Sequence, residues 1–260
     1  MKSMACYNMK GGVGKTSFAV NFAYLSAANG VRTMVWDLDP QGAATFHLGV
    51  EPLEQTKLKK LIKDKKLIKN MVEPTPYANL SVIPAGFDYR NMDMVLDDSK
   101  KSRKKLKKII SSFEENYDLF LFDCPPSISN LSEVIFSTVE YILMPVVPAV
   151  MPQQSFLKVK EYLSSMNETC AELIPFFNMV DRRKSGHRKI MWDNKKEFKN
   201  YFCENFIPAR ADVEKMGIER APLHAFAAKS SAAVAYKDLW KEITKKTGLI
   251  SEKLTAQIAQ

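Results

Sequence analysis

The chain has 260 residues, 46% of them hydrophobic, so it can bury a substantial core as one large α/β domain rather than two small ones. No apolar run of about 18 residues is present, and the N-terminus enters a glycine loop at once, so neither a membrane span nor a signal peptide is indicated. We therefore expect a cytoplasmic protein. The net charge of +9 indicates a polyanionic partner such as nucleic acid or an anionic membrane surface.

Apolar runs of strand length alternate with amphipathic stretches along the chain. The expected strands are residues 4–9, 33–37, 80–84, 119–123, 141–147 and 173–179. The expected helices are residues 16–28, 131–138 and 156–166, together with lysine-rich stretches at 57–69 and 100–108. Strands that are almost entirely apolar and alternate with helices predict a doubly wound, mainly parallel sheet with helices on both faces. We assign residues 1–247 to this domain and 248–260 to a short tail.

A glycine loop with the sequence KGGVGKT, residues 10–16, follows the first expected strand and opens the first helix. Its glycines permit positive φ and a close backbone approach, so that successive N–H groups bind phosphate at the helix N-terminus. Lys15 would reach the β- and γ-phosphates of ATP, and the Thr16 hydroxyl would ligate Mg²⁺. The residues expected to hold the nucleotide here are Gly11, Gly12, Val13, Gly14, Lys15, Thr16 and Ser17.

The loop departs from the usual phosphate-loop pattern GxxxxGK[ST] at one place. Met9 stands where the first glycine is expected, and a second lysine, Lys10, follows it. In this the loop resembles the deviant Walker A family of ParA, MinD and nitrogenase iron protein, whose signature reads xKGGxGK[TS]. The resemblance implies that Lys10 reaches across a nucleotide-sandwich homodimer to the phosphates of the partner subunit, so that dimerisation depends on ATP.

Aspartates end two of the expected strands. Asp123, beside the phosphate loop, is placed to hold the water shell of Mg²⁺. Asp37 and Asp39 would share one strand face because side chains alternate with a period of two, so both would point toward the metal and the γ-phosphate. Residues 37–42 and 123–127 resemble the switch I and switch II segments of ParA proteins. The resemblance implies that Asp39 positions the attacking water and that Asp37 acts nearer the magnesium.

The likeness to ParA proteins continues through residues 141–148, 177–182, 206–208 and 229–236, although residues 210–224 match poorly. It implies that Asn178 bonds the adenine base and that the segment after Pro208 closes over it. A strand-end asparagine is otherwise a common turn former.

Short ParA proteins bind DNA without sequence preference through basic residues in their C-terminal half. The excess positive charge agrees with such binding. Candidate contacts are Lys199, Arg210, Lys229 and Lys237, although a surface lysine is usually only solvated. The resemblance further implies association with the nucleoid and an activator that is ParB-like or another cargo-adaptor protein.

Three alternatives accompany this interpretation. A MinD-like membrane-associated positioning ATPase is disfavoured, because the tail at 248–260 has one lysine and one glutamate and lacks a basic amphipathic pattern. Nitrogenase iron protein needs two cluster-ligating cysteines per subunit, and beside Cys124 no second ligand position is evident. A nucleotide-dependent scaffold that binds ATP without turning it over is the non-enzyme alternative.

Overall fold

The computed structural model describes residues 1–53, 65–86, 89, 99–166, 171–198 and 201–250. Their strands form one seven-stranded sheet in the order β3-β4-β2-β5-β1-β6-β7. The strands are β1 (Lys2–Cys6), β2 (Thr33–Asp37), β3 (Glu73–Pro74), β4 (Leu80–Ile83), β5 (Leu119–Asp123), β6 (Tyr141–Val146) and β7 (Glu172–Phe177). Every pairing is parallel except that of the short edge strand β3 with β4. The predicted doubly wound, mainly parallel sheet is therefore confirmed.

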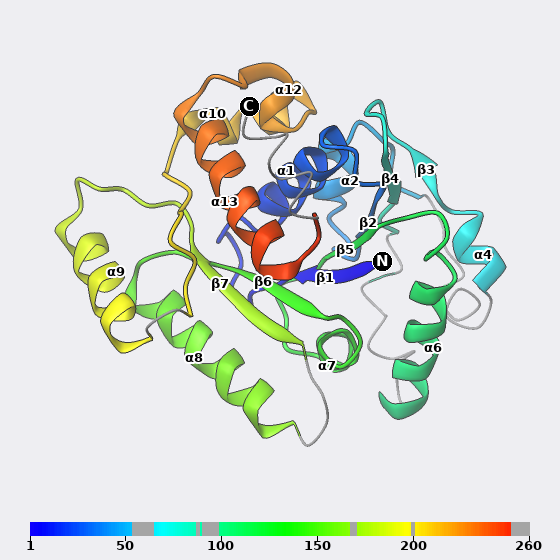
Figure 1. Cartoon of the computed structure of the whole chain (residues 1–260), viewed down its shortest axis with the longest axis horizontal. Helices are drawn as coiled ribbons and strands as arrows, with labels where there is room; N and C mark the ends of the chain where they lie inside the picture. The colour runs from blue at the N-terminus through cyan, green and yellow to red at the C-terminus, as the bar shows by residue number, and fades with distance from the viewer. Residues whose placement is uncertain (54–64, 87–88, 90–98, 167–170, 199–200, 251–260) are drawn as a thin grey trace.

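Helices cover both faces of this sheet (Figure 1). The longer ones are α1 (Lys15–Ala28), α6 (Ser99–Ser111), α7 (Asn130–Phe136), α8 (Val150–Ser165), α9 (Ser185–Glu197) and α13 (Ser231–Thr247). The shorter ones are α2 (Ala43–His47), α4 (Lys65–Lys69), α10 (Ala211–Glu214), α11 (Met216–Glu219) and α12 (Leu223–Ala227). Apolar residues of α1 and α13 pack on one face, and those of α6, α7 and α8 pack on the other.

Strand β5 shows why the strands read as continuous apolar runs. Leu119 and Leu121 belong to the core beneath α1 and α13, whereas Phe120 and Phe122 belong to the core beneath α6 and α7. All four side chains are fully buried. Because successive side chains point to opposite faces, a strand buried on both sides needs apolar residues at every position.

The predicted element boundaries hold best in the middle of the sheet. The predictions for β2 and β5 match to the residue, whereas β1 ends at Cys6, so residues 7–9 lie in the phosphate loop rather than in a strand. Helix α8 begins at Val150 and not at residue 156. Strand β3, helix α2 and helices α9 to α13 were not predicted. Two residues are too few for a strand pattern, α2 and α10 to α12 have only four or five residues each, and α9 is mostly polar.

The lysine-rich helices and the tail are described only in part. In the region of α6, Ile109, Ile110 and Phe113 are buried as the helical spacing predicts. Within the stretch 57–69, α4 is helical, and residues 57–64 lie outside the described residues. Helix α13 ends at Thr247 and is capped by Gly248, but Ile250 packs into the same core, so ordered packing continues past residue 247. The described helices include none long and apolar enough to cross a bilayer.

Candidate nucleotide site

Three strand ends meet at the centre of the sheet. Cys6 on β1, Asp123 on β5 and Asp37 on β2 are paired in register across neighbouring strands. From β1 the chain crosses over β5 to reach β2, and from β5 it crosses over β1 in the opposite direction to reach β6. The strand connections therefore diverge at the centre of the sheet, between β1 and β5. Crevices at such a switch point are where α/β sheets bind ligands.

The phosphate loop joins β1 to α1, and its glycines have the conformation that the sequence predicts. Gly12 has φ 71° and Gly14 has φ 84°. A Cβ on Gly14 would lie 2.3 Å from Nδ2 of Asn178, so only glycine fits there. The first turn of α1 follows directly, and its free N–H groups face the loop.

Asn8 fixes the start of the loop, a role that the motif did not reveal. Its buried side chain donates from Nδ2 to the Pro145 carbonyl at 2.8 Å and accepts at Oδ1 from the Lys10 N–H at 2.9 Å. Lys15 donates from Nζ to the Lys10 carbonyl at 3.1 Å. Lys10 is thus held through its backbone, while its side chain remains partly exposed. An asparagine at the end of an apolar strand was the available signal for this anchor.

The carboxylate of Asp123 is buried. Neither of its oxygens accepts a hydrogen bond of good geometry from the described residues. Burial raises its pKa well above the usual range, and the neighbouring Asp37 raises it further, whereas the Thr16 hydroxyl and the Lys15 ammonium lower it. A buried, unpaired carboxylate is costly unless a cation accompanies it. Oxygen donors of this kind suit Mg²⁺, so the residues present fit the ion.

Asp37 is also buried, but its oxygens are used by the protein. Oδ2 accepts from the N–H and the hydroxyl of Thr45, both at 2.8 Å, and Oδ1 accepts from the Asp39 N–H at 3.2 Å. Burial nevertheless raises the pKa of Asp37 to about 6. Asp37 therefore anchors α2, and its role near the metal stays a prediction.

Asp39 does not share a strand face with Asp37, so that expectation was wrong. Strand β2 ends at Asp37, and Asp39 lies in the following turn. There its Oδ1 accepts from the Gln41 N–H at 3.0 Å, and its carbonyl accepts from the Gly42 N–H at 2.9 Å. The turn leads directly into α2, so the position of Asp39 depends on this helix.

A pocket beside the phosphate loop brings together the residues expected to hold the base. It is lined by Gly14, Ser17, Asn178, Met179, Ile207, Pro208, Ala209, Arg210, Val213, Glu214 and Tyr236. Asn178 follows β7 and donates from Nδ2 to the Val13 carbonyl at 2.7 Å, which ties the loop to the pocket. Its other amide hydrogen and Oδ1 remain available for a base. Pro208 sits beside it because the N–H of Ile207 bonds the Phe177 carbonyl at 3.0 Å.

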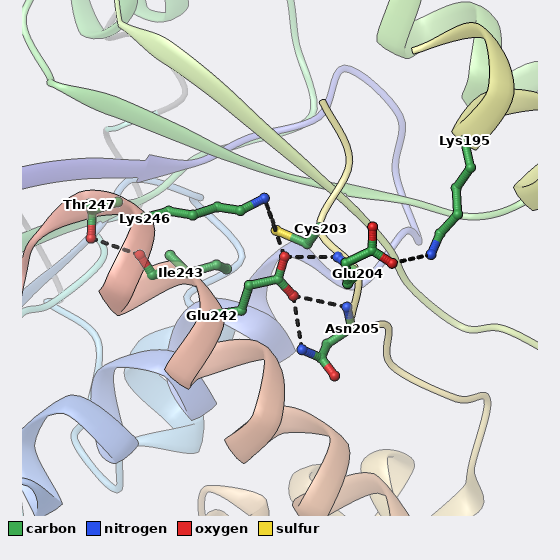
Figure 2. A network of polar contacts seen from close by, with 8 residues as sticks. All are labelled: Lys195, Cys203, Glu204, Asn205, Glu242, Ile243, Lys246 and Thr247. Atoms are coloured by element: carbon green, nitrogen blue, oxygen red, sulfur yellow. Dashed lines mark hydrogen bonds and ion pairs between the residues drawn. The ribbon is translucent and has the colours of Figure 1, made fainter. Parts of the chain in front are cut away.

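A polar network on α13 holds the chain that leads into this pocket (Figure 2). The Glu242 carboxylate accepts from the N–H groups of Glu204 and Asn205 at 2.8 and 2.9 Å and from the Asn205 side chain at 2.9 Å. Lys246 pairs with Glu242 at 3.2 Å. Burial alone would raise the pKa of Glu242, but the backbone hydrogen bonds lower it below its usual value. This network fixes the chain just before Ile207 and Pro208.

The basic residues proposed to contact DNA are partly brought together. Arg210 donates to the Ser231 hydroxyl at 3.0 Å at the start of α13, and Lys229 is exposed immediately before that helix. Lys237 is exposed further along α13, and Lys199 lies outside the described residues.

No residue of helix α9 was among the predicted DNA contacts, yet this helix exposes several cations around one aromatic side chain. Trp192 is 71% exposed. Arg188, Lys189 and Lys196 are exposed one helical turn from it on the same face. The i, i+3, i+4 spacing of these residues was the signal in the sequence that could have found this surface.

A glycine loop at a helix N-terminus, a lysine inside it and buried carboxylates at the neighbouring strand ends define a P-loop nucleotide-binding protein. Residues 1–174 match the family described as AAA domain. The chain therefore belongs to this family. It is a partition ATPase of the ParA/MinD superfamily.

The relatives and neighbouring structures agree with this assignment. The sporulation initiation inhibitor protein Soj of Bacillus subtilis is 29% identical over 255 residues, covering 93% of this chain and 98% of that protein. The chromosome-partitioning ATPase Soj of Treponema pallidum is 27% identical over 95% of this chain and 98% of its own. The structure of the septum site-determining protein MinD of Pyrococcus horikoshii with Mg-ADP has a TM-score of 0.75 at 20% identity, covering 96% and 99% of the two chains. The last similarity concerns the fold alone.

Proposed function

We propose that this ParA-type positioning ATPase closes into a homodimer on binding ATP and Mg²⁺ and associates with DNA without sequence preference. It hydrolyses ATP slowly on its own and faster when a cargo-bound activator engages it. The observation that carries the proposal is the partly exposed Lys10 beside the buried Lys15, at the edge of the sheet where Asp123 and Asp37 meet. The protein would segregate or position a plasmid, a chromosome or a protein assembly.

In this site, Lys15 and the N–H groups of the loop would bind the phosphates, and Asp123 with Thr16 would hold Mg²⁺. The ion would neutralise the charge that develops on the transferred phosphoryl group. Asp39 would orient the attacking water from the turn after β2. Asn178 and Pro208 would hold the adenine base on the opposite side.

Exposed apolar side chains on the same edge support a face-to-face dimer. Ile128 follows β5 and is 58% exposed, while Val150 and Met151 follow β6 and are 64% and 57% exposed. Apolar side chains concentrated around a site favour burial against another protein surface. Because β5 and β6 flank β1, which leads into the phosphate loop, a second copy that covered these side chains would bring its Lys10 toward the nucleotide.

Dimerisation is tested with Asp39→Ala, which would bind ATP without hydrolysing it. With ATP and Mg²⁺ this variant is expected to double its mass in multi-angle light scattering, and a persistent monomer would contradict the dimer. Lys10→Ala is the matched comparison: it should still bind ATP but fail to dimerise. Lys15→Ala should weaken ATP binding itself, because it removes the cation that contacts the bound phosphates.

DNA binding is tested by electrophoretic mobility shift on duplex DNA with ATP. Since phosphate contacts release counterions, the shift should weaken steeply as salt rises. Absence of a salt-sensitive shift would contradict the proposed DNA binding. The scaffold alternative is separated by phosphate release from Mg-ATP by the wild-type chain, which a scaffold would not give.

A further inference from the structure

Helices α10 and α11 connect the base pocket to switch I. At the start of this segment, Val213 and Glu214 line the pocket together with Gly14 and Asn178. The segment then continues through α11, which packs against α2. It is also the stretch where the sequence departs most from the ParA pattern. The residues that hold it in place therefore belong to this chain rather than to the shared motifs.

The far end of the segment is fastened by two contacts to α2 and by a third to Glu51, four residues beyond that helix. Nδ1 of His47 lies 3.1 Å from the Met216 carbonyl oxygen. The guanidinium carbon of Arg220 lies 4.4 Å from the centroid of the Phe46 ring, and its Nη2 lies 2.7 Å from Oε1 of Glu51. The ion pair is exposed, 41% for Arg220 and 79% for Glu51, so water screens it, and the stacking of the guanidinium on the Phe46 ring is the main contact that holds Arg220.

Arg220 adopts a backbone conformation that non-glycine residues rarely take. Its φ is 47°, in the left-handed region. This conformation lets the chain turn after α11, so that the side chain reaches back to α2. A residue held in this region persists only where its surroundings fix it, and such residues concentrate at functional sites.

The opposite side of α2 faces the reaction. Buried Thr45 donates from its N–H and hydroxyl to Asp37, and its hydroxyl accepts from the Ala85 N–H at 2.9 Å. The Phe46 N–H bonds the Gly42 carbonyl at 2.9 Å, which ties α2 to the turn that carries Asp39. Helix α2 thus lies between the reacting side of the site and the segment that lines the base pocket.

We propose that Arg220 is a positioning residue for hydrolysis, which fastens α2 to the segment 211–220 and so holds Asp39 in place relative to a nucleotide bound in the pocket. The proposal rests on the proposed function of Asp39. Arg220 acts through α2 and does not line the base pocket. Its loss should slow the chemical step and change ATP binding little, because Arg220 lies at the end of the segment away from Val213 and Glu214, which line the pocket.

The test compares Arg220→Ala, Arg220→Lys and Lys215→Ala in the full-length chain. Lys215 is the matched control, since it lies in the same segment but pairs with Asp212 inside it at 3.3 Å. For basal Mg-ATP hydrolysis, we expect Arg220→Ala to lower kcat about tenfold with KM within about twofold, as for a lost orienting contact. Arg220→Lys should recover most of kcat, because lysine keeps the cation, and Lys215→Ala should resemble wild type.

A second measurement separates positioning from general damage. Combining Arg220→Ala with Phe46→Leu should reduce kcat no further than the stronger single substitution, because both remove the same fastening. An unchanged kcat in Arg220→Ala, an equal loss in Lys215→Ala, or a rise in KM that accounts for the change in kcat/KM would each overturn the inference. A wild-type chain without ATP hydrolysis would instead contradict the proposed function.

Discussion

The phosphate side and the base side of the nucleotide site are built in different ways. On the phosphate side, neighbouring strand ends in register place Asp37 and Asp123, and one short loop supplies the lysines. On the base side, contacts join residues far apart in the chain, such as Asn178 with Val13, which are 165 positions apart. Local motifs therefore determine the first side, whereas the second depends on individual side chains that connect distant segments.

The largest effect is expected where the two sides meet, at Gly14. Gly14→Ala would introduce a Cβ 2.3 Å from Nδ2 of Asn178 at a φ of 84°. Left-handed strain and overpacking together should lower the free energy of unfolding by on the order of 3 kcal/mol. Urea unfolding and the fluorescence of a labelled ATP analogue would measure the loss of stability and of binding.

Gly11→Ala is the matched control for stability, because no heavy atom lies within 4 Å of a Cβ built there. Its unfolding free energy should change by less than about 0.5 kcal/mol. Equal destabilisation by both substitutions would mean that Asn178 does not set the requirement for glycine, and the two sides would then be independent.

The next effect concerns the buried carboxylates of the phosphate side. Asp37 and Asp123 have pKa values raised in the folded state, to about 6 for Asp37. Above the pKa of 3.8 that an aspartate has when unfolded, the folded chain binds more protons, so its stability should fall as pH rises toward 7. For the shift of Asp37 the full loss is on the order of 3 kcal/mol, and about half of it falls between pH 5 and pH 7.5. Urea unfolding in EDTA at pH 5 and pH 7.5 would measure it.

Asp123→Asn should flatten this pH dependence, because it removes one of the two buried charges. Asp118→Asn serves as the control: Arg32 lowers the pKa of Asp118, so the stabilisation by that carboxylate is complete above pH 3.8 and should not change between pH 5 and pH 7.5. If the unfolding free energy of wild type and of Asp123→Asn fell by the same amount between pH 5 and pH 7.5, the charge on Asp123 would not destabilise the folded chain, and the argument that it needs a cation would be wrong.

The same difference explains how much the sequence could predict. Strands β2 and β5 and the residues of the phosphate loop were identified because each pattern is contiguous. The anchoring of Lys10 by Asn8 involves Pro145, and Glu242 holds residues 204 and 205, so neither follows from a local pattern. The placement of Asp39 was mistaken because the strand ends two residues earlier, which periodicity alone does not reveal.

A smaller effect is expected on the base side at Glu242. Glu242→Gln keeps the shape but removes the charge that accepts two backbone N–H groups, so unfolding free energy should fall by about 1–2 kcal/mol. ATP affinity should fall severalfold, because the segment before Ile207 loses its support. The pKa of Glu242 is lowered in the folded state, so its stabilisation is present above 4.5 and is lost as pH falls through its folded pKa. The difference from wild type should therefore shrink near pH 4.

The smallest effect is expected from Lys195→Ala, which removes the ion pair between α9 and Glu204 in the same network (Figure 2). The carboxylate of Glu204 is 76% exposed, so water and salt screen the pair, and its loss should cost less than about 0.5 kcal/mol. What holds residue 204 is its backbone N–H on Glu242, which this substitution leaves in place. Urea unfolding and ATP affinity should therefore match wild type. A loss equal to that of Glu242→Gln would mean that surface charge, rather than the buried backbone contacts, supports the base side.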